Sequence, residues 1–130
     1  MVGRRADERA VSDFLDSLPH RSSALVIEGE AGIGKTTLWA DAARRAGESG
    51  YRVLSCRAAA AESVLAYTVL ADLLGDVDDA VWADLPAPQQ QALAGALLRH
   101  LVEASGIDPR AVAAAFVAVI DRLASVSPVV

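Results

Sequence analysis

The sequence predicts an α/β fold: a single domain, rich in helix, that contains a partial parallel sheet. Residues 24–27 form a continuous apolar run with β-branched members, which is typical of a strand buried on both faces. A glycine-rich turn and a segment of helical periodicity follow at once, and residues 51–56 give a second strand candidate. Strand, glycine loop, helix and strand in this order make a βαβ unit. The length of 130 residues suits one domain.

Two helices are expected in the N-terminal half. The first carries one apolar stripe at helical spacing, made by Val11, Phe14, Leu15 and Leu18. Pro19 follows and is expected to end it. The second helix is expected over residues 36–46, with Gly47 at its end and Gly50 marking the turn into the second strand.

The C-terminal half is expected to be mainly helical. One helix is predicted over residues 64–74, closed by Gly75, and another from the Pro86/Pro88 pair to about Val102. Asp108 and Pro109 predict a further helix start, with aspartate as the N-cap and proline in the first turn. Its apolar face comprises Val112, Phe116, Val119, Ile120 and Leu123. Residues 128–130 resemble the beginning of a third strand.

Composition and charge exclude several classes of protein. Hydrophobic residues make up 53% and charged residues 22%, which is enough apolar material for a core. The net charge is −5, with nine Lys or Arg against eight Asp or Glu in residues 1–60 and three against nine in residues 61–130. Neither half has a basic stripe, so direct contact with nucleic acid is not expected. The longest apolar run, residues 111–120, is half the ~20 residues of a membrane-spanning helix. No membrane association is expected.

Cys56 is the only cysteine, so an intrachain disulfide is excluded and a cytoplasmic location is expected. A small buried side chain in the second strand is the expected role of this residue. The two histidines, His20 and His100, have no partner at metal-ligand spacing. Trp39 and Trp82 are interpreted as packing groups rather than base-stacking platforms.

The glycine-rich turn satisfies the P-loop pattern, which is glycine, four residues, and then Gly-Lys-Thr. Its residues are Gly29, Glu30, Ala31, Gly32, Ile33, Gly34, Lys35 and Thr36. The glycines let the backbone approach an anion, and successive N–H groups form a nest for phosphates at the start of a helix. Lys35 is predicted to reach the β- and γ-phosphates, and Thr36 to ligate Mg²⁺. Thr37 is a further donor candidate near the α-phosphate. The alternative is a glycine-rich turn without a ligand.

The stretch from Ala24 to Trp39 resembles the ATPase domain of large ATP-binding transcriptional regulators of the LuxR type, within the AAA-like STAND class of P-loop NTPases. Val2-Gly3-Arg4-Arg5 with Glu8 is similar to the box that precedes the first helix of that domain, where it lines the adenine side. A solvated chain start is the equal alternative, and Arg4 is the better candidate of the two arginines. Residues 52–57 and 65–74 are similar to the second strand and the following helix.

The resemblance implies ATP, with Mg²⁺, as the ligand and favours ATP over GTP. It also implies an acidic pair after a third strand, which here would begin at Pro128. We therefore expect residues 1–130 to be the incomplete N-terminal portion of a single P-loop ATPase domain, a truncated version of the AAA-like fold with little hydrolysis of its own. Asp78 and Asp79 superficially resemble the acidic pair, but a solvated loop is the favoured interpretation.

Two other functions remain open: a small nucleotide or metabolite kinase, and a non-catalytic P-loop remnant that acts as an interaction module. The small number of arginines in residues 61–130 argues against a kinase, whose lid clamps the transferring phosphate with arginines. In the strand order that the resemblance implies, residues 24–27 lack their neighbours and residues 51–56 can pair only with residues 129–130. Unpaired strand edges of this kind favour self-association.

Overall fold

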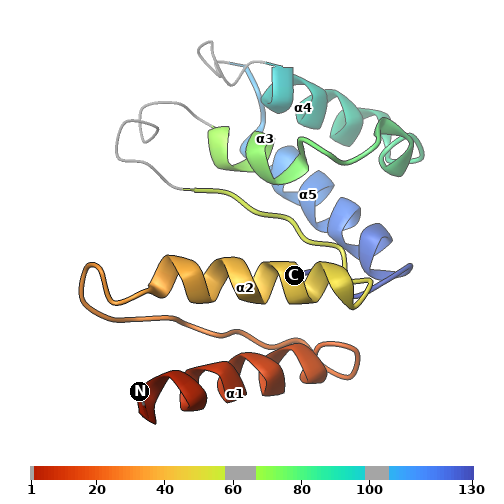
Figure 1. The fold of residues 1–130 in the computed structure, drawn as a ribbon. Coiled ribbons are helices and arrows are strands. Elements are labelled where there is room, and N and C mark those ends of the chain that lie inside the picture. The colour runs from red at the N-terminus through yellow and green to blue at the C-terminus, as the bar shows by residue number, and fades with distance from the viewer. Residues whose placement is uncertain (1, 58–66, 99–105) are drawn as a thin grey trace. The chain divides into compact units, whose positions relative to one another are not determined.

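The computed structural model of the chain describes residues 2–57, 67–98 and 106–130 (Figure 1). The chain divides into two compact units. The first contains residues 1–53 together with 127–130, and the second contains residues 54–126.

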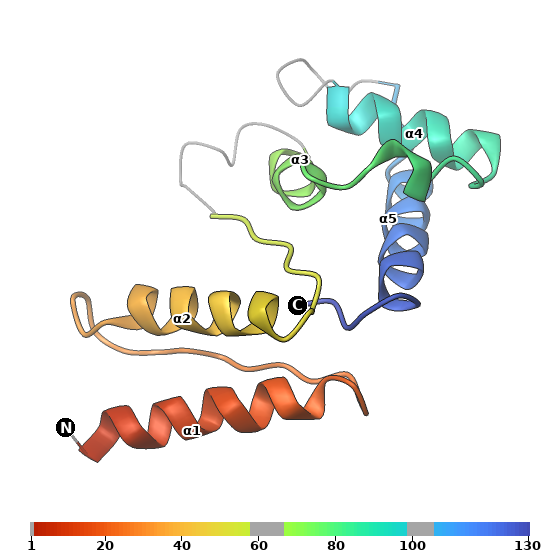
Figure 2. The ribbon, with the colours of Figure 1, turned by 45° about the vertical axis from the view of Figure 1, so that its right-hand side comes forward.

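The first unit is built on two helices, α1 (Val2–Ser17) and α2 (Lys35–Glu48). Figures 1 and 2 show the two helices side by side and pointing the same way, with the connecting segment running back between them. Val11 and Leu15 of α1 and Ala46 of α2 are buried where the helices pack. The partly buried residues around them are Phe14, Leu18, Leu38, Ala42, Tyr51, Val53 and Val130.

The predicted apolar stripe of the first helix is confirmed, because all four of its residues belong to this core. The helix ends at Ser17, two residues before Pro19, as the proline predicts. It begins much earlier than expected, at Val2, so the Gly3-Arg4-Arg5 box lies inside α1 rather than before it. The stripe begins only at Val11, and the polar first turns gave no apolar signal by which the start could be placed.

The end of α2 corrects the prediction for Gly47. The helix continues through Gly47 and ends at Glu48, and the left-handed residue after it is Gly50, which has a φ of +81°. Gly50 N donates to Gly47 O, and Tyr51 N donates to Ala46 O, each at 3.0 Å. This pair of hydrogen bonds is a Schellman motif, in which the left-handed residue follows the helix by two positions.

The strand predicted at residues 24–27 does not form. The segment is extended, but within the described ranges no strand is assigned, and Val26 is 74% exposed. Apolar residues favour a strand only when other strands pair with its backbone and cover its faces. No neighbouring strand is present here, so the partial parallel sheet of the sequence prediction is absent from the described part of the chain.

The second predicted strand is reduced to one parallel bridge between Arg52 and Val129. Arg52 N donates to Pro128 O at 2.8 Å, and Val130 N donates to Arg52 O at 2.9 Å. The expected partner of residues 51–56 is therefore confirmed, although a bridge replaces the strand.

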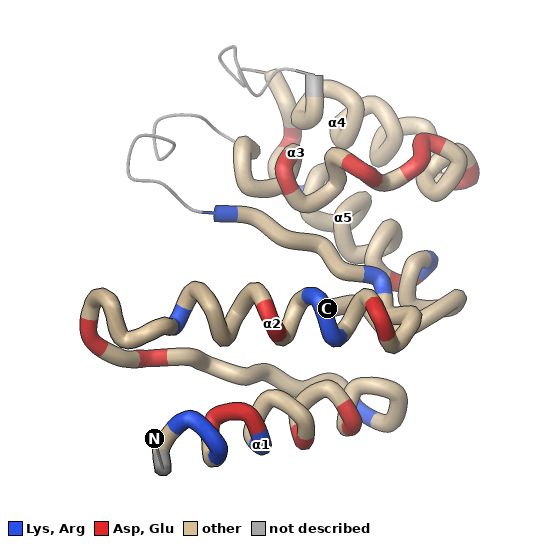
Figure 3. Tube along the Cα trace, viewed as in Figure 1, with Lys and Arg blue, Asp and Glu red and all other residues tan. Residues whose placement is uncertain are grey.

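The second unit contains α3 (Thr68–Leu74), the 3₁₀ helix η2 (Asp79–Val81), α4 (Ala87–Leu98) and α5 (Pro109–Ala124). Helix α4 packs against both α3 and α5, and η2 contacts α5. The buried core residues are Leu74, Val77, Leu85, Leu93, Ala115 and Val119. Figure 3 shows acidic positions along the connection between α3 and α4, in the half of the chain that carries the acid excess.

The helices of this unit agree with the sequence prediction except at the start of α3. Helix α3 ends at Leu74, directly before Gly75, as predicted, but Tyr67 is its left-handed N-cap, with a φ of +65°, rather than part of the helix. Residues 64–66 of the expected helix lie outside the described residues. The described part of α4 ends at Leu98, and the expected continuation to Val102 lies beyond it. Asp108 is the N-cap of α5, as predicted, and its Oδ1 accepts from Arg110 N at 2.9 Å.

Candidate functional site: the loop before α2 and its cleft

The predicted phosphate loop turns the chain from the extended segment into α2. Gly32 has a φ of +81° and Gly34 a φ of +98°, both in the left-handed region that side chains with a Cβ disfavour. Gly34 is also the N-cap residue of α2. The helix begins at Lys35, one residue before the predicted start, and its first backbone N–H groups therefore lie next to the loop.

Gly29 is needed for a different reason, because the loop closes tightly around it. A Cβ on Gly29 would lie 3.0 Å from Ile33 Cγ2 and 3.8 Å from Lys35 Cδ. The backbone of Gly29 therefore passes close beneath the side chains that follow it in the loop. A larger residue would push Ile33 away from its position.

Lys35 folds back over the start of the loop. Its Nζ donates to Gly29 O at 2.5 Å and to Glu30 O at 2.6 Å. The loop is also held by Ile33 N, which donates to Glu30 O at 3.4 Å. An ammonium group has three N–H donors, so these two carbonyls leave one of them for another acceptor.

The remaining loop residues face solvent. Glu30, Ala31, Ile33 and the first-turn residues Thr36 and Thr37 of α2 are all exposed. Both threonines therefore lie at the surface, at the start of α2.

A cleft of about 720 Å³ opens beside the loop, within the first unit. One wall is the exposed face of α1 near its N-terminus, with Gly3, Arg4, Asp7 and Glu8. The extended residues 25–28 form a second wall, and the start of α2 forms a third, with residues 33–35, Thr37, Leu38 and Asp41. The Gly3-Arg4 pair and the end of the phosphate loop at residues 33–35, which are 29 or more positions apart in the sequence, thus line one cleft, whereas residues 29–32 and Thr36 do not line it.

The charges around this cleft have mixed signs. Arg4 and Lys35 provide the cations, and Asp7, Glu8, Glu28 and Asp41 provide the carboxylates. Arg4 Nε lies 3.6 Å from Glu8 Oε1, with both side chains more than half exposed, so this pair contributes little to stability.

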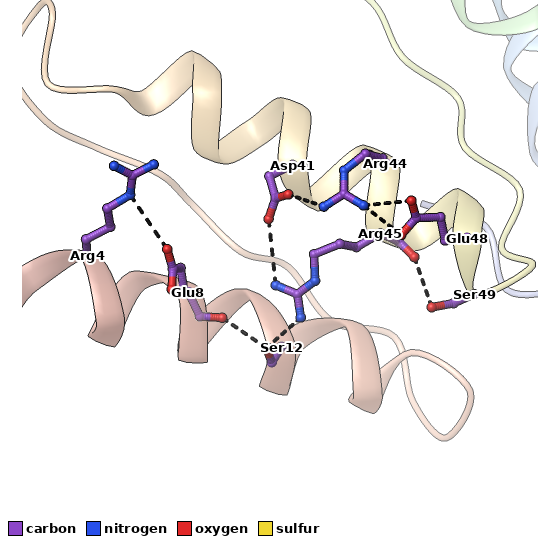
Figure 4. A network of polar contacts seen from close by, with 8 residues as sticks. All are labelled: Arg4, Glu8, Ser12, Asp41, Arg44, Arg45, Glu48 and Ser49. Carbon is purple, nitrogen blue, oxygen red and sulfur yellow. Dashed lines mark hydrogen bonds and ion pairs between the residues drawn. The ribbon is translucent and has the colours of Figure 1, made fainter.

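A network of polar contacts connects the two helices that flank the cleft (Figure 4). On α2, Arg44 pairs with Asp41 and with Glu48. Hydrogen bonds to Asp41 and Glu48, together with their negative charges, raise the pKa of Arg44 above its usual value. Arg45 extends from α2 to α1, where its Nη2 donates to Ser12 Oγ at 2.6 Å.

Asp7 and Asp41 are cleft residues that the sequence interpretation missed. On α1, the cleft residues Gly3, Arg4, Asp7, Glu8 and Val11 recur with the spacing of one helix face. On α2, Thr37, Leu38 and Asp41 do the same. If the helix had been predicted to begin at Val2, its periodicity would have placed these polar residues on the same face as the apolar stripe, one to two turns before Val11.

The structure also places the other residues that the sequence singled out. Trp82 packs against the core of the second unit, as predicted, whereas Trp39 is 42% exposed on α2 and the packing interpretation is wrong for it. Cys56 is half-buried outside any strand, which corrects both parts of its prediction. The described residues form no sheet that could cover it.

Asp78 has a local structural role. It is the N-cap of η2, and its Oδ1 accepts from Ala80 N at 2.9 Å, while Asp79 lies exposed in the first turn. His20 is exposed, and His100 lies outside the described residues. Within the described ranges, no group of three or more His, Cys, Asp or Glu side chains could hold a metal ion. No helix in the same ranges is both long and apolar enough to cross a bilayer.

Comparison with known proteins identifies the family. The family model described as "AAA ATPase domain" matches residues 1–130. Searches of curated proteins and of solved structures gave no match. AAA ATPase domains are P-loop NTPases, which as a class bind nucleotides and generally use ATP with Mg²⁺. The chain belongs to the family of AAA ATPase domains.

Proposed function

We propose that this chain binds ATP with Mg²⁺ through residues 29–37. The observation that carries the proposal is the position of Lys35. Its ammonium group lies over the carbonyls of Gly29 and Glu30, at the N-terminus of a helix and beside left-handed glycines. This combination brings a positive charge, a helix terminus and a left-handed glycine backbone together at one point, which suits a phosphate chain.

Lys35 is the proposed ligand of the β- and γ-phosphates. Two of its three N–H donors already hold the loop carbonyls, and the third is directed to a phosphate oxygen in the proposed complex. The first N–H groups of α2, which have no partner within the helix, add further donors. In the proposed complex, phosphate oxygens replace water on the free donor of Lys35 and on these N–H groups, and no hydrogen bond of the loop is broken.

Thr36 is the proposed metal ligand. Mg²⁺ prefers hard oxygen donors and usually takes one or two from the protein and the rest from phosphate and water. Thr36, which is exposed and comes one residue after Lys35, carries such a donor at the start of α2. When bound, the ion would neutralise part of the phosphate charge, which favours binding next to the carboxylates that line the cleft.

The cleft beside the loop is the proposed site of the nucleoside. It continues from Lys35 and Thr37 to Gly3 and Arg4, which supports the interpretation of this pair as part of the adenine side. The preference for ATP over GTP rests on the resemblance described above. The same resemblance supports the wider proposal that the chain is the nucleotide-binding part of a STAND-class, LuxR-type transcriptional regulator.

The test uses the fact that Lys35 is the only lysine. An acyl-phosphate ATP probe can label this chain only at Lys35 and at the N-terminal amine. Mass spectrometry should find the label at Lys35, and excess Mg²⁺–ATP should suppress it. Label that is restricted to the N-terminus, or that persists during competition, would contradict the proposal.

A calorimetric titration with Mg²⁺–ATP provides the quantitative test. Lys35→Ala should weaken binding by roughly 10- to 150-fold, because it removes a hydrogen bond from a charged donor. Arg21→Ala is the matched control, since Arg21 is exposed in the same unit, lies outside the cleft and carries the same charge. Equal losses in both variants would attribute the effect to net charge.

The alternative functions give different results in these assays. A non-catalytic remnant would neither bind ATP nor protect Lys35 from the probe. A small kinase would bind ATP but would also transfer its γ-phosphate to a metabolite or nucleotide, which a screen of phosphoryl acceptors detects.

A further inference from the structure

We infer that Arg45 is a positioning residue for the nucleotide cleft, which it controls by holding the α1 wall in register with α2 through Ser12. This inference rests on the proposed function of the cleft and assigns a role to a residue outside the phosphate loop.

The contacts of Arg45 extend in two directions (Figure 4). Its Nη1 lies 3.9 Å from Asp41 Oδ2 on its own helix, and its Nη2 donates to Ser12 Oγ on α1 at 2.6 Å. Ser12 Oγ in turn donates to Glu8 O at 3.0 Å, one helical turn nearer the N-terminus of α1. A continuous path of polar contacts thus runs from α2 to the part of α1 that borders the cleft.

Both ends of this path are cleft residues. Asp41 belongs to the α2 wall, and Glu8 belongs to the α1 wall and pairs with Arg4 at 3.6 Å. Arg45 does not line the cleft. It therefore has no direct contact with the proposed ligand, and any effect it has on binding must pass through the two walls.

The apolar contacts between the helices do not fix this arrangement by themselves. Val11, Leu15 and Ala46 bury apolar surface and so set the separation of α1 and α2. Such contacts are non-directional, and they tolerate small sliding and rotation of one helix on the other. A short hydrogen bond requires a defined distance and angle, so the contact between Arg45 and Ser12 favours one register beside the cleft, as the hydrogen bond from the Tyr51 hydroxyl to Leu15 O does beyond the end of α2.

Neighbouring Arg44 provides a comparison. It also pairs with Asp41, but its other partner is Glu48 on the same helix, and its side chain is 55% exposed against 31% for Arg45. The two arginines thus share type, helix and one partner. They differ in the link to α1, which only Arg45 makes among the described contacts.

The experiment compares Mg²⁺–ATP with Mg²⁺–tripolyphosphate, which offers phosphates to the loop but no nucleoside to the cleft. Dissociation constants are measured for the wild type, Arg45→Ala, Ser12→Ala, the double variant and Arg44→Ala. Removal of one hydrogen bond between the walls should weaken ATP binding by about two- to tenfold in Arg45→Ala and in Ser12→Ala. The double variant should lose no more than either single one, because both remove the same contact. Tripolyphosphate affinity, and both affinities of Arg44→Ala, should stay within twofold of the wild type.

Several results would overturn the inference. Equal losses for ATP and tripolyphosphate would show general damage to the fold, and losses that add in the double variant would show that the residues act independently. A loss in Arg44→Ala as large as in Arg45→Ala would show a charge effect. If circular dichroism shows that Arg45→Ala is unfolded, Ser12→Ala alone still tests the inference. This variant is expected to fold, because alanine favours a helix.

The same measurements distinguish failure of this inference from failure of the proposed function. A wild-type chain that binds neither ligand would refute the proposed nucleotide site and this inference with it. A wild-type chain that binds both ligands equally well would leave the phosphate loop intact as a site and overturn only the role of the α1 wall.

Discussion

Gly32 and Gly50 offer a matched pair of substitutions at the two ends of α2. Both have a φ of +81°, and at both positions an added Cβ would meet no atom within 4 Å. Alanine at either site therefore introduces no steric clash beyond its own backbone. The cost of holding alanine in the left-handed region is about 1–2 kcal/mol.

The hydrogen bonds around each glycine decide whether this cost lowers the free energy of unfolding or the affinity for ATP. At Gly50 the left-handed conformation is required by the hydrogen bonds of Gly50 N and Tyr51 N to the end of α2. Gly50→Ala should therefore lower the free energy of unfolding by about 1 kcal/mol and leave the affinity for Mg²⁺–ATP unchanged. Gly32 lies in an exposed loop, which can relax to a right-handed or extended conformation when alanine is present.

A relaxed loop must return to the binding conformation when the nucleotide binds. The cost of holding alanine in the left-handed region is then subtracted from the free energy of binding. Gly32→Ala should weaken ATP binding by about 5- to 30-fold, the equivalent of 1–2 kcal/mol, with little change in the thermal midpoint. Thermal unfolding by circular dichroism and titration calorimetry on both variants measure the two quantities. Gly32→Ala with wild-type affinity and wild-type stability would refute the reasoning, and so would a Gly50→Ala variant that loses as much affinity as Gly32→Ala.

Three further predictions concern the rest of the chain. Asp108→Ala should lower the free energy of unfolding by about 1 kcal/mol in a denaturant titration, because it removes the cap of α5. Asp108→Asn retains an acceptor and should keep most of the wild-type free energy of unfolding. Leu93→Ala, at a fully buried position of α4, should lower it by about 2–5 kcal/mol, whereas Leu93→Met should lower it by less than about 1.5 kcal/mol; equal losses would contradict the packing. Val26→Lys should reduce self-association in analytical ultracentrifugation, because Val26 is 74% exposed in an extended apolar segment and lysine blocks edge pairing. An unchanged sedimentation profile would show that this segment is not the contact.

The helices were predictable because their signals are local. The stripe from Val11 to Leu18 needs only a spacing of three or four residues, and the Asp108-Pro109 start needs two adjacent side chains. The strand predictions are wrong because the requirements of a strand are not local. Residues 24–27 have the composition of a buried strand, but a strand also requires backbone partners from elsewhere in the chain, and the described residues supply none. Trp39 was misplaced for the same reason, since only a covering layer would bury it.

The candidate site was predictable in part. The loop residues could be predicted from the sequence because both fixed glycines meet a backbone requirement, which is close approach at Gly29 and a left-handed φ at Gly34. Gly32, at a variable position of the pattern, is also left-handed. The cleft could not be read in the same way. Its α1 wall depends on how α1 packs against α2, and the polar residues that form it, Asp7 and Glu8, resemble any solvated helix face in the sequence.

The loop keeps its shape without a sheet behind it, and the described contacts explain how. Its C-terminal side is fixed because Gly34 and Lys35 begin α2, whose other end is anchored to α1 by Ala46. Its N-terminal side follows an extended segment that has no strand partner among the described residues, and Gly29 and Glu30 accept hydrogen bonds from the ammonium group of Lys35. The same side chain that is proposed to bind phosphate therefore also closes the loop. A phosphate chain that engages Lys35 would bind to a loop that this residue has already ordered, which lowers the entropic cost of binding.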